Sequence, residues 1–219
     1  MSFLLHAGTA QKGLKKRLIH LVLTEYSFSD HIKEFTKKEH QELEKELVIQ
    51  IKSIRNIDEY IQLLGLFYHY YTPIEQLLEK WLANDERIPD YAQRRKSAAI
   101  LNDINACGYT LPVIGHSPPI PAIDSFAAAI GAAYVMEGST LGGTIIAKMI
   151  STQLDIPATK GFSFFNGYGD ATRAMWERFR AYLNALATTT EQENAAATAR
   201  NTFVNFKIWA NSYGPVFKI

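Results

Sequence analysis

Apolar residues recur along most of the 219-residue chain at spacings of three, four and eight, the period of a helix with one buried face. The first such segment carries Ile32, Phe35 and Leu43, with Ser29 and Asp30 as candidate N-caps. The pattern predicts helices over about 29–52, 56–83, 91–106, 123–153, 171–187 and 191–211. No alternating strand pattern persists and no repeat appears. We therefore expect an all-α, single-domain helical bundle over residues 29–219, after an N-terminal extension, 1–28, of unassigned role.

Prolines and polar caps place the boundaries between these helices. Pro73 falls inside the second predicted helix and should kink or split it, because proline lacks an N–H and clashes with the preceding turn. The stretch HSPPIP, 116–121, has three prolines in four positions and predicts a rigid loop. The stretch TTTEQE, 188–193, resembles the capped start of a final helix.

The segment YVMEGSTLGG, 134–143, places Gly138, Gly142 and Gly143 within the longest apolar run. Each glycine costs a helix interior about 1 kcal/mol relative to alanine. Either the helix is interrupted here, or something must come very near its backbone. A G-x-x-x-G pattern is more often a site of close helix–helix packing than of ligand contact, and the pattern alone leaves both interpretations open.

A second candidate site lies in FTKKEHQELE, 35–44. His40 has Glu44 one turn later on the same helical face, and Lys33 two turns earlier, at roughly 10 Å. A metal-bound imidazole usually has a partner that orients it, as Glu44 would here. On spacing alone, a solvated surface helix with i, i+4 ion pairs is the favoured explanation. Together with the glycines, however, the histidine suggests a planar metal cofactor held between two helices, and haem fits that description.

From about Lys33 to Trp209 the sequence resembles the haem oxygenase family. TKKEH and Glu44 resemble the proximal helix, whose histidine ligates the iron, and YHYYTPIE, 68–75, resembles the second-helix pattern Y-H-x-Y-x-x-x-E. EGSTLGG resembles the distal helix of the bacterial branch of the family. The segment starting FSFFNGYGD resembles the one that follows, with Arg180 at the position of a propionate-binding arginine.

The resemblance implies a role for each matched residue. His40 would ligate the haem iron, with Glu44 as its partner, and Lys33 and Arg180 would meet the propionates. The backbone at Gly138, Gly142 and Gly143 would approach the ligand, and the last helix would bring its aromatic residues to the haem edge; these are Phe203 and Phe206. Haem would be both cofactor and substrate, cleaved with O2 to biliverdin, carbon monoxide and ferrous iron. Electrons would come from an external reductase or ferredoxin.

Two departures from the family pattern bear on activity. Ser139 stands where many members have an aspartate that holds waters near bound oxygen, although its hydroxyl can also position a water and Tyr68 matches a tyrosine of that network. Trp176 stands where a second propionate-binding lysine is expected. These departures keep open a non-catalytic haem-binding protein, or a bundle of the same fold without haem. A di-iron carboxylate oxidase is disfavoured, because the sequence has no E-x-x-H pair.

Composition excludes several other classes. The net charge of +1 and the short basic cluster at 12–17 predict no nucleic-acid partner. No uncharged apolar run approaches the length of about 20 residues that spans a bilayer. The N-terminal basic residues follow the apolar patch, the reverse of a secretory signal, and one cysteine, Cys107, permits no intramolecular disulfide. We expect a cytoplasmic protein without membrane or nucleic-acid partners. The sequence has no flavin or nicotinamide motif that would identify the electron donor, and the family resemblance implies an external one.

Overall fold

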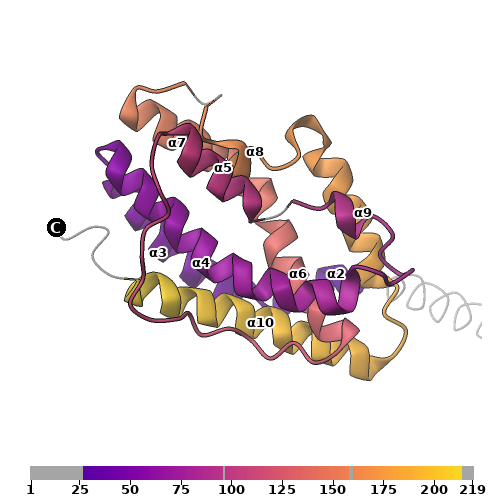
Figure 1. Cartoon of the computed structure of the whole chain (residues 1–219). Coiled ribbons are helices and arrows are strands. Elements are labelled where there is room, and N and C mark those ends of the chain that lie inside the picture. Colours follow the sequence, from indigo (N-terminus) through magenta and orange to yellow (C-terminus); the bar gives the residue numbers. More distant parts are fainter. Residues whose placement is uncertain (1–26, 96, 158–159, 214–219) are drawn as a thin grey trace, which may run out of the picture.

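A computed structural model describes residues 27–95, 97–157 and 160–213 (Figure 1), and within these ranges all regular structure is helical. In chain order the elements are α2 (Phe28–Phe35), α3 (Lys37–Ser53), α4 (Ile57–Leu82), η1 (Tyr91–Gln93), α5 (Ala98–Ala106), α6 (Phe126–Gly138), α7 (Thr140–Leu154), α8 (Ser163–Asn166), η2 (Gly169–Ala171), α9 (Thr172–Asn184) and α10 (Thr189–Ser212). The basic cluster at 12–17 and nearly all of the predicted N-terminal extension lie outside the described residues.

Side-chain caps fix where the first and last helices begin. Ser27 is the N-cap of α2: its hydroxyl accepts from the Asp30 amide, and the Asp30 carboxylate accepts from the Ser27 amide, both at 3.3 Å. The expectation that Ser29 or Asp30 is the cap was therefore wrong, because Asp30 serves as the third residue of a capping box. Thr188 and Glu191 form the same arrangement at the start of α10, which confirms the predicted capped start.

Three predicted helices are divided in the structure. The first breaks at Thr36, which is buried and whose hydroxyl donates to the Ile32 carbonyl at 2.7 Å, a local bond that often bends helices. The third is reduced to η1 and α5, because the segment between them bonds to other parts of the fold. The long apolar helix breaks at Ser139 into α6 and α7. By contrast, α4 passes through Pro73 without the expected split.

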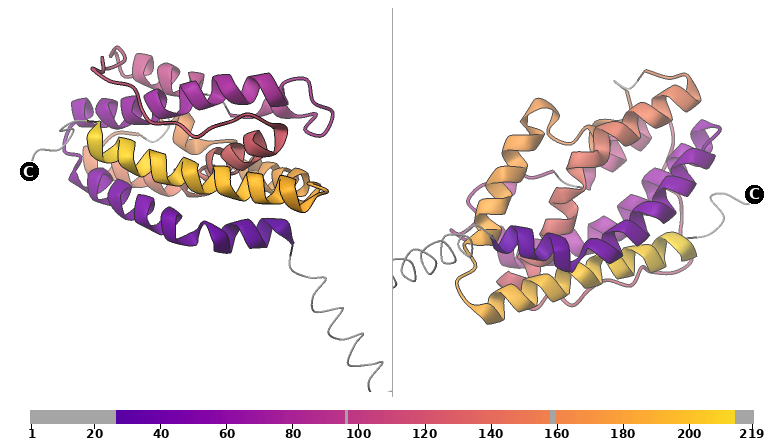
Figure 2. Two further views of the ribbon diagram at one scale, coloured as in Figure 1. Left: turned by 90° about the horizontal axis from the view of Figure 1, so that it is seen from below. Right: turned by 180° about the vertical axis from the view of Figure 1, so that it is seen from behind.

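Helix α6 forms the centre of the bundle. Every residue from Phe126 to Glu137 is buried, and the helix packs most extensively against α10. Gly131 makes this approach possible, because a Cβ there would lie 2.1 Å from the Ala195 carbonyl oxygen of α10. Figures 1 and 2 show α10 lying across the same side of the molecule as the lower part of α6.

Three tyrosines of α4 are buried in this core, and burial raises the pKa of each phenol above its ordinary value. Tyr60 donates to the Gly161 carbonyl and Tyr70 to the Thr202 carbonyl, both at 2.6 Å; the third is Tyr71.

Because the folded-state pKa values are raised, stability is full below the ordinary tyrosine pKa of about 10 and declines as the pH rises above it. We predict that in alkaline titration the buried tyrosinate absorption appears together with the loss of helical circular dichroism. Ionisation of all eleven tyrosines before any helix is lost would contradict this assignment.

Candidate functional site

Two bent helix pairs, α2–α3 and α6–α7, frame the candidate site, and they touch at both ends. At one end the Tyr134 hydroxyl is hydrogen-bonded to the side chain of Thr36. At the other, the Gln153 amide donates to the carbonyls of Ile51 and Ile54, each at 3.0 Å. At 1.5 Å per residue the path from the first contact to the second is about 22 Å on α3 and about 28 Å on α6–α7. The longer path is accommodated by its bend (Figure 2, right panel).

His40 lies on α3 between the two contacts. Its side chain is exposed, and its ring centroid lies 5.2 Å from that of Phe203 on α10. Among the described residues, no hydrogen bond engages either ring nitrogen. Glu44 is also exposed, and within the same part of the chain no hydrogen bond joins it to His40, so the predicted orienting pair is not formed. The imidazole is therefore open to a ligand, and Phe203 supports it from behind.

The three glycines opposite His40 have three different surroundings. A Cβ at Gly143 would lie 2.0 Å from the Phe165 carbonyl oxygen, and a Cβ at Gly138 would lie 3.6 Å from the Trp176 ring. A Cβ at Gly142 would meet nothing within 4 Å. The Cβ direction of Gly143 is thus filled by protein, and the expected cofactor contact at this glycine stays a prediction. Gly143 therefore allows close packing against the backbone of α8, whereas Gly142 faces open space.

Two cations meet at the end of the site formed by α2 and α9. Arg180 forms an ion pair with Asp30 at 3.2 Å and donates to the Ser29 hydroxyl at 3.1 Å. The pKa of Asp30 is lowered chiefly by the Ser27 hydroxyl, and the positive charges of Arg180 and Lys33 add to that effect. Lys33 and Arg180 therefore both act on the Asp30 carboxylate.

A cavity of about 520 Å3 lies between α7 and α9, next to the bend. Leu141 lines it on α7, and Arg173, Trp176 and Glu177 line it on α9. Trp176 has an aromatic neighbour, Tyr134, at 5.7 Å between ring centroids. Where the family pattern would place a lysine, this chain therefore has a flat apolar wall.

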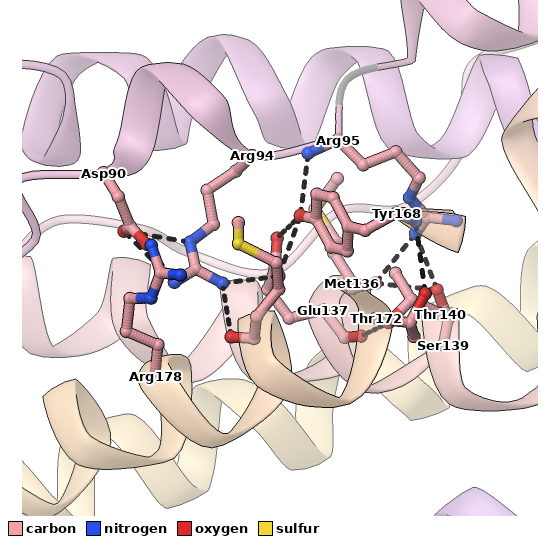
Figure 3. Close-up of polar contacts among 11 residues, drawn as sticks. Asp90, Arg94, Arg95, Met136, Glu137, Ser139, Thr140, Tyr168, Thr172 and Arg178 are labelled. Carbon is pink, nitrogen blue, oxygen red and sulfur yellow. Dashed lines mark hydrogen bonds and ion pairs between the residues drawn. The ribbon is translucent and has the colours of Figure 1, made fainter. Parts of the chain in front are cut away.

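The bend itself is held from the side by a polar network (Figure 3). The Ser139 hydroxyl donates to the Met136 carbonyl at 2.7 Å and accepts from the Arg95 guanidinium at 2.8 Å. The phenol that bonds to Ser139 belongs to Tyr71, one turn beyond the Tyr68 that the sequence comparison selected. No hydrogen bond joins Tyr68 to Ser139 in the described part of the chain; the Tyr68 ring lies 5.7 Å from that of His69.

Buried charges extend the network away from the site. Arg94 is 2% exposed and forms ion pairs with Glu137 at 2.7 Å and with Asp90 at 2.9 Å, and Tyr168 donates to Glu137 at 2.9 Å. Sequence reasoning missed these residues. The available signal was Glu137, an acidic residue inside an otherwise apolar segment, since a buried carboxylate requires a cationic partner.

The two predicted aromatic contacts on α10 have different surroundings. Phe203 lies against His40, whereas Phe206 is 2% exposed and stacks on Tyr70, with ring centroids 4.4 Å apart. Phe206 is therefore a core residue, and only Phe203 reaches the candidate site.

Comparison with known proteins identifies the family. Residues 119–212 match the family described as heme oxygenase. A heme oxygenase of Xanthomonas campestris pv. campestris (strain 8004) is 32% identical over 150 residues, covering 68% of this chain and 87% of that protein. The chain belongs to the heme oxygenase family. The resemblance noted in the sequence is thereby confirmed.

Solved heme oxygenases share the fold of this chain. The NO- and CO-bound enzyme of Neisseria meningitidis superposes with a TM-score of 0.72 at 22% identity, covering 85% of this chain and 92% of that one. The enzyme of Leptospira interrogans gives a TM-score of 0.64 at 20% identity, covering 84% and 98%. The predicted all-α fold is confirmed.

Two further predictions can be compared with the described residues. The described residues contain no group of three or more His, Cys, Asp or Glu side chains placed to hold a metal ion. This part of the chain therefore offers no di-iron ligand set. They also contain no helix that is long and apolar enough to cross a membrane.

Proposed function

We propose that this chain is a haem oxygenase that binds haem between α3 and the α6–α7 bend. The observation that carries the proposal is the pairing of an exposed, unengaged imidazole at His40 with open space at Gly142, between helix pairs that touch on either side. Imidazole is a common axial ligand of haem iron, and a glycine allows the backbone to approach a flat ring closely. The residues present therefore fit the group.

Each residue at the site has a distinct task. His40 offers a ring nitrogen to the iron, and Phe203 packs behind the imidazole. Lys33 and Arg180 supply positive charge for the carboxylates of the haem edge, with Arg180 exchanging part of its pairing with Asp30 and Glu177. Gly142 leaves the distal side open, and Leu141 and Trp176 provide apolar walls there. Glu44 orients His40 through a bond that would form only in the loaded protein.

Bound haem supplies the iron that activates O2, and it is also the substrate whose ring is opened to biliverdin, carbon monoxide and ferrous iron. The reaction needs reducing equivalents, which we assign to an external reductase or ferredoxin. The single cysteine favours a reducing, cytoplasmic setting for this exchange.

One observation favours a second candidate, a haem-binding protein without turnover. The Ser139 proton is donated to Met136 and not toward the site, so this hydroxyl does not replace the missing aspartate as a donor. Activity would then rest on backbone groups and on water placed by other residues.

A spectral titration with haemin, followed by ascorbate or a ferredoxin reductase system in air, separates these candidates. Loss of the Soret band with growth of biliverdin absorption, insensitive to catalase, is the expected result. A stable one-to-one complex that never degrades would establish binding alone. Absence of any Soret change on adding haemin would contradict both.

A further inference from the structure

Arg95 holds the bend between α6 and α7 from outside the proposed haem site. It lies in the non-helical segment between η1 and α5, and its guanidinium donates to the Met136 carbonyl and the Ser139 hydroxyl, each at 2.8 Å. The same group donates to the Phe164 carbonyl at 3.1 Å and lies 4.2 Å from the centre of the Phe164 ring. The planar guanidinium of Arg95 thus joins the last turn of α6 to α8.

Ser139 is the hinge on which this fork acts. It is the single residue between α6 and α7, and its hydroxyl donates to Met136 while accepting from Arg95. A serine hydroxyl has one proton, and Ser139 donates it within the protein. Ser139 therefore fixes the backbone of the bend and has no proton left to donate to a water in the site.

The Arg95 backbone is itself anchored. Its amide donates to the Tyr168 hydroxyl at 2.8 Å, which in turn donates to Glu137, the residue before Gly138. Arg94 binds the same carboxylate from the other side. Two consecutive arginines thus bind the C-terminal end of α6, where backbone carbonyls lose their helical partners and need other donors.

We infer that Arg95 is a positioning residue that sets the angle between α6 and α7. Through this angle it sets the distance between the Gly142 backbone and the proposed haem site. Gly142 lies three residues beyond the hinge, so a small change of angle at Ser139 displaces it directly. The catalytic part of this inference rests on the proposed function. The structural part concerns the chain without haem and can be tested separately.

The first arm of the test measures hydrogen exchange of the full chain without haem. Arg95→Gln should accelerate exchange in the peptide covering 136–143 by about tenfold or more, the effect expected from losing hydrogen bonds to a charged group. Arg95→Lys should accelerate hydrogen exchange in this peptide to a similar extent, because an ammonium group cannot bond to three acceptors in a plane. Arg178→Gln is the matched control, since Arg178 joins the same network at its exposed end, through Asp90 at 3.4 Å.

The second arm uses the haem-loaded protein. Arg95→Gln should retain the His40-ligated Soret band and bind haem nearly as well as wild type, while ring opening slows by about 10- to 100-fold, as misplacement by about 1 Å can cause. The ratio of the biliverdin isomers formed, measured after their separation by chromatography, should also change. A residue that only stabilised the fold would alter neither the isomer ratio nor the local exchange pattern.

Exchange at 136–143 that stays at the wild-type rate in Arg95→Gln, or that rises equally in every helix, would overturn the inference. Wild-type behaviour of Arg95→Lys in both arms would overturn it as well, because charge alone would then suffice. If the wild-type chain binds no haem, the proposed function fails, and the exchange arm still decides the role of Arg95 at the hinge.

Discussion

His40→Ala is expected to abolish the histidine-ligated haem spectrum while the protein remains folded. The imidazole is exposed on α3 and contacts Phe203 only at its edge of the core, so its removal opens no buried cavity. Without a nitrogen ligand the iron has no protein bond on this side, and haem is held only by Lys33, Arg180 and apolar contacts. Haem titration followed by absorption spectroscopy, with circular dichroism of the same samples, measures both effects.

Two controls make this result specific. His31→Ala removes another exposed imidazole one helix earlier, which lies between the rings of Phe28 and Phe35, and it should leave the Soret band unchanged. Added imidazole should restore a ligated spectrum to His40→Ala, because it can enter the space left by the side chain. A ligated spectrum in His40→Ala without added imidazole would show that another residue holds the iron.

Substituting leucine at Gly142 and at Gly143 should give opposite results at neighbouring positions. At Gly143 the new side chain would collide with the Phe165 backbone, which cannot move without shifting α8, so we expect a loss of about 3 kcal/mol or more in the free energy of unfolding. At Gly142 the side chain would enter open space, and the helix would gain about 1 kcal/mol in intrinsic propensity.

The cost of Gly142→Leu should appear instead in haem affinity. A side chain projecting into the proposed haem site would have to be displaced by the haem ring, which weakens haem binding by about 100-fold, or roughly 3 kcal/mol. Denaturant unfolding and haem titration of both variants, with Gly143→Ala as a gentler version of the destabilised one, separate the two roles. Strong haem binding by Gly142→Leu would mean that the ring does not lie at this glycine.

The sequence by itself determined which segments are helical and which of their residues share a face. His40, Glu44 and Lys33 could be placed together because their spacing follows the helical period, a property of the local chain. The family resemblance likewise depended on short motifs whose order is visible in one dimension. The capped start of α10 was predicted from Thr188 and Glu191 for the same reason.

Only the tertiary structure decided what each glycine faces and what Ser139 can do. The neighbours of Gly138 and Gly143 come from α9 and α8, more than twenty residues away in the chain, whereas Gly142 faces open space, so identical residue types have different surroundings. Arg95 reaches Ser139 across 44 positions, and its bonds use the hydroxyl that the sequence suggested for water. Local periodicity carries no information about such contacts, because they depend on how the helices pack.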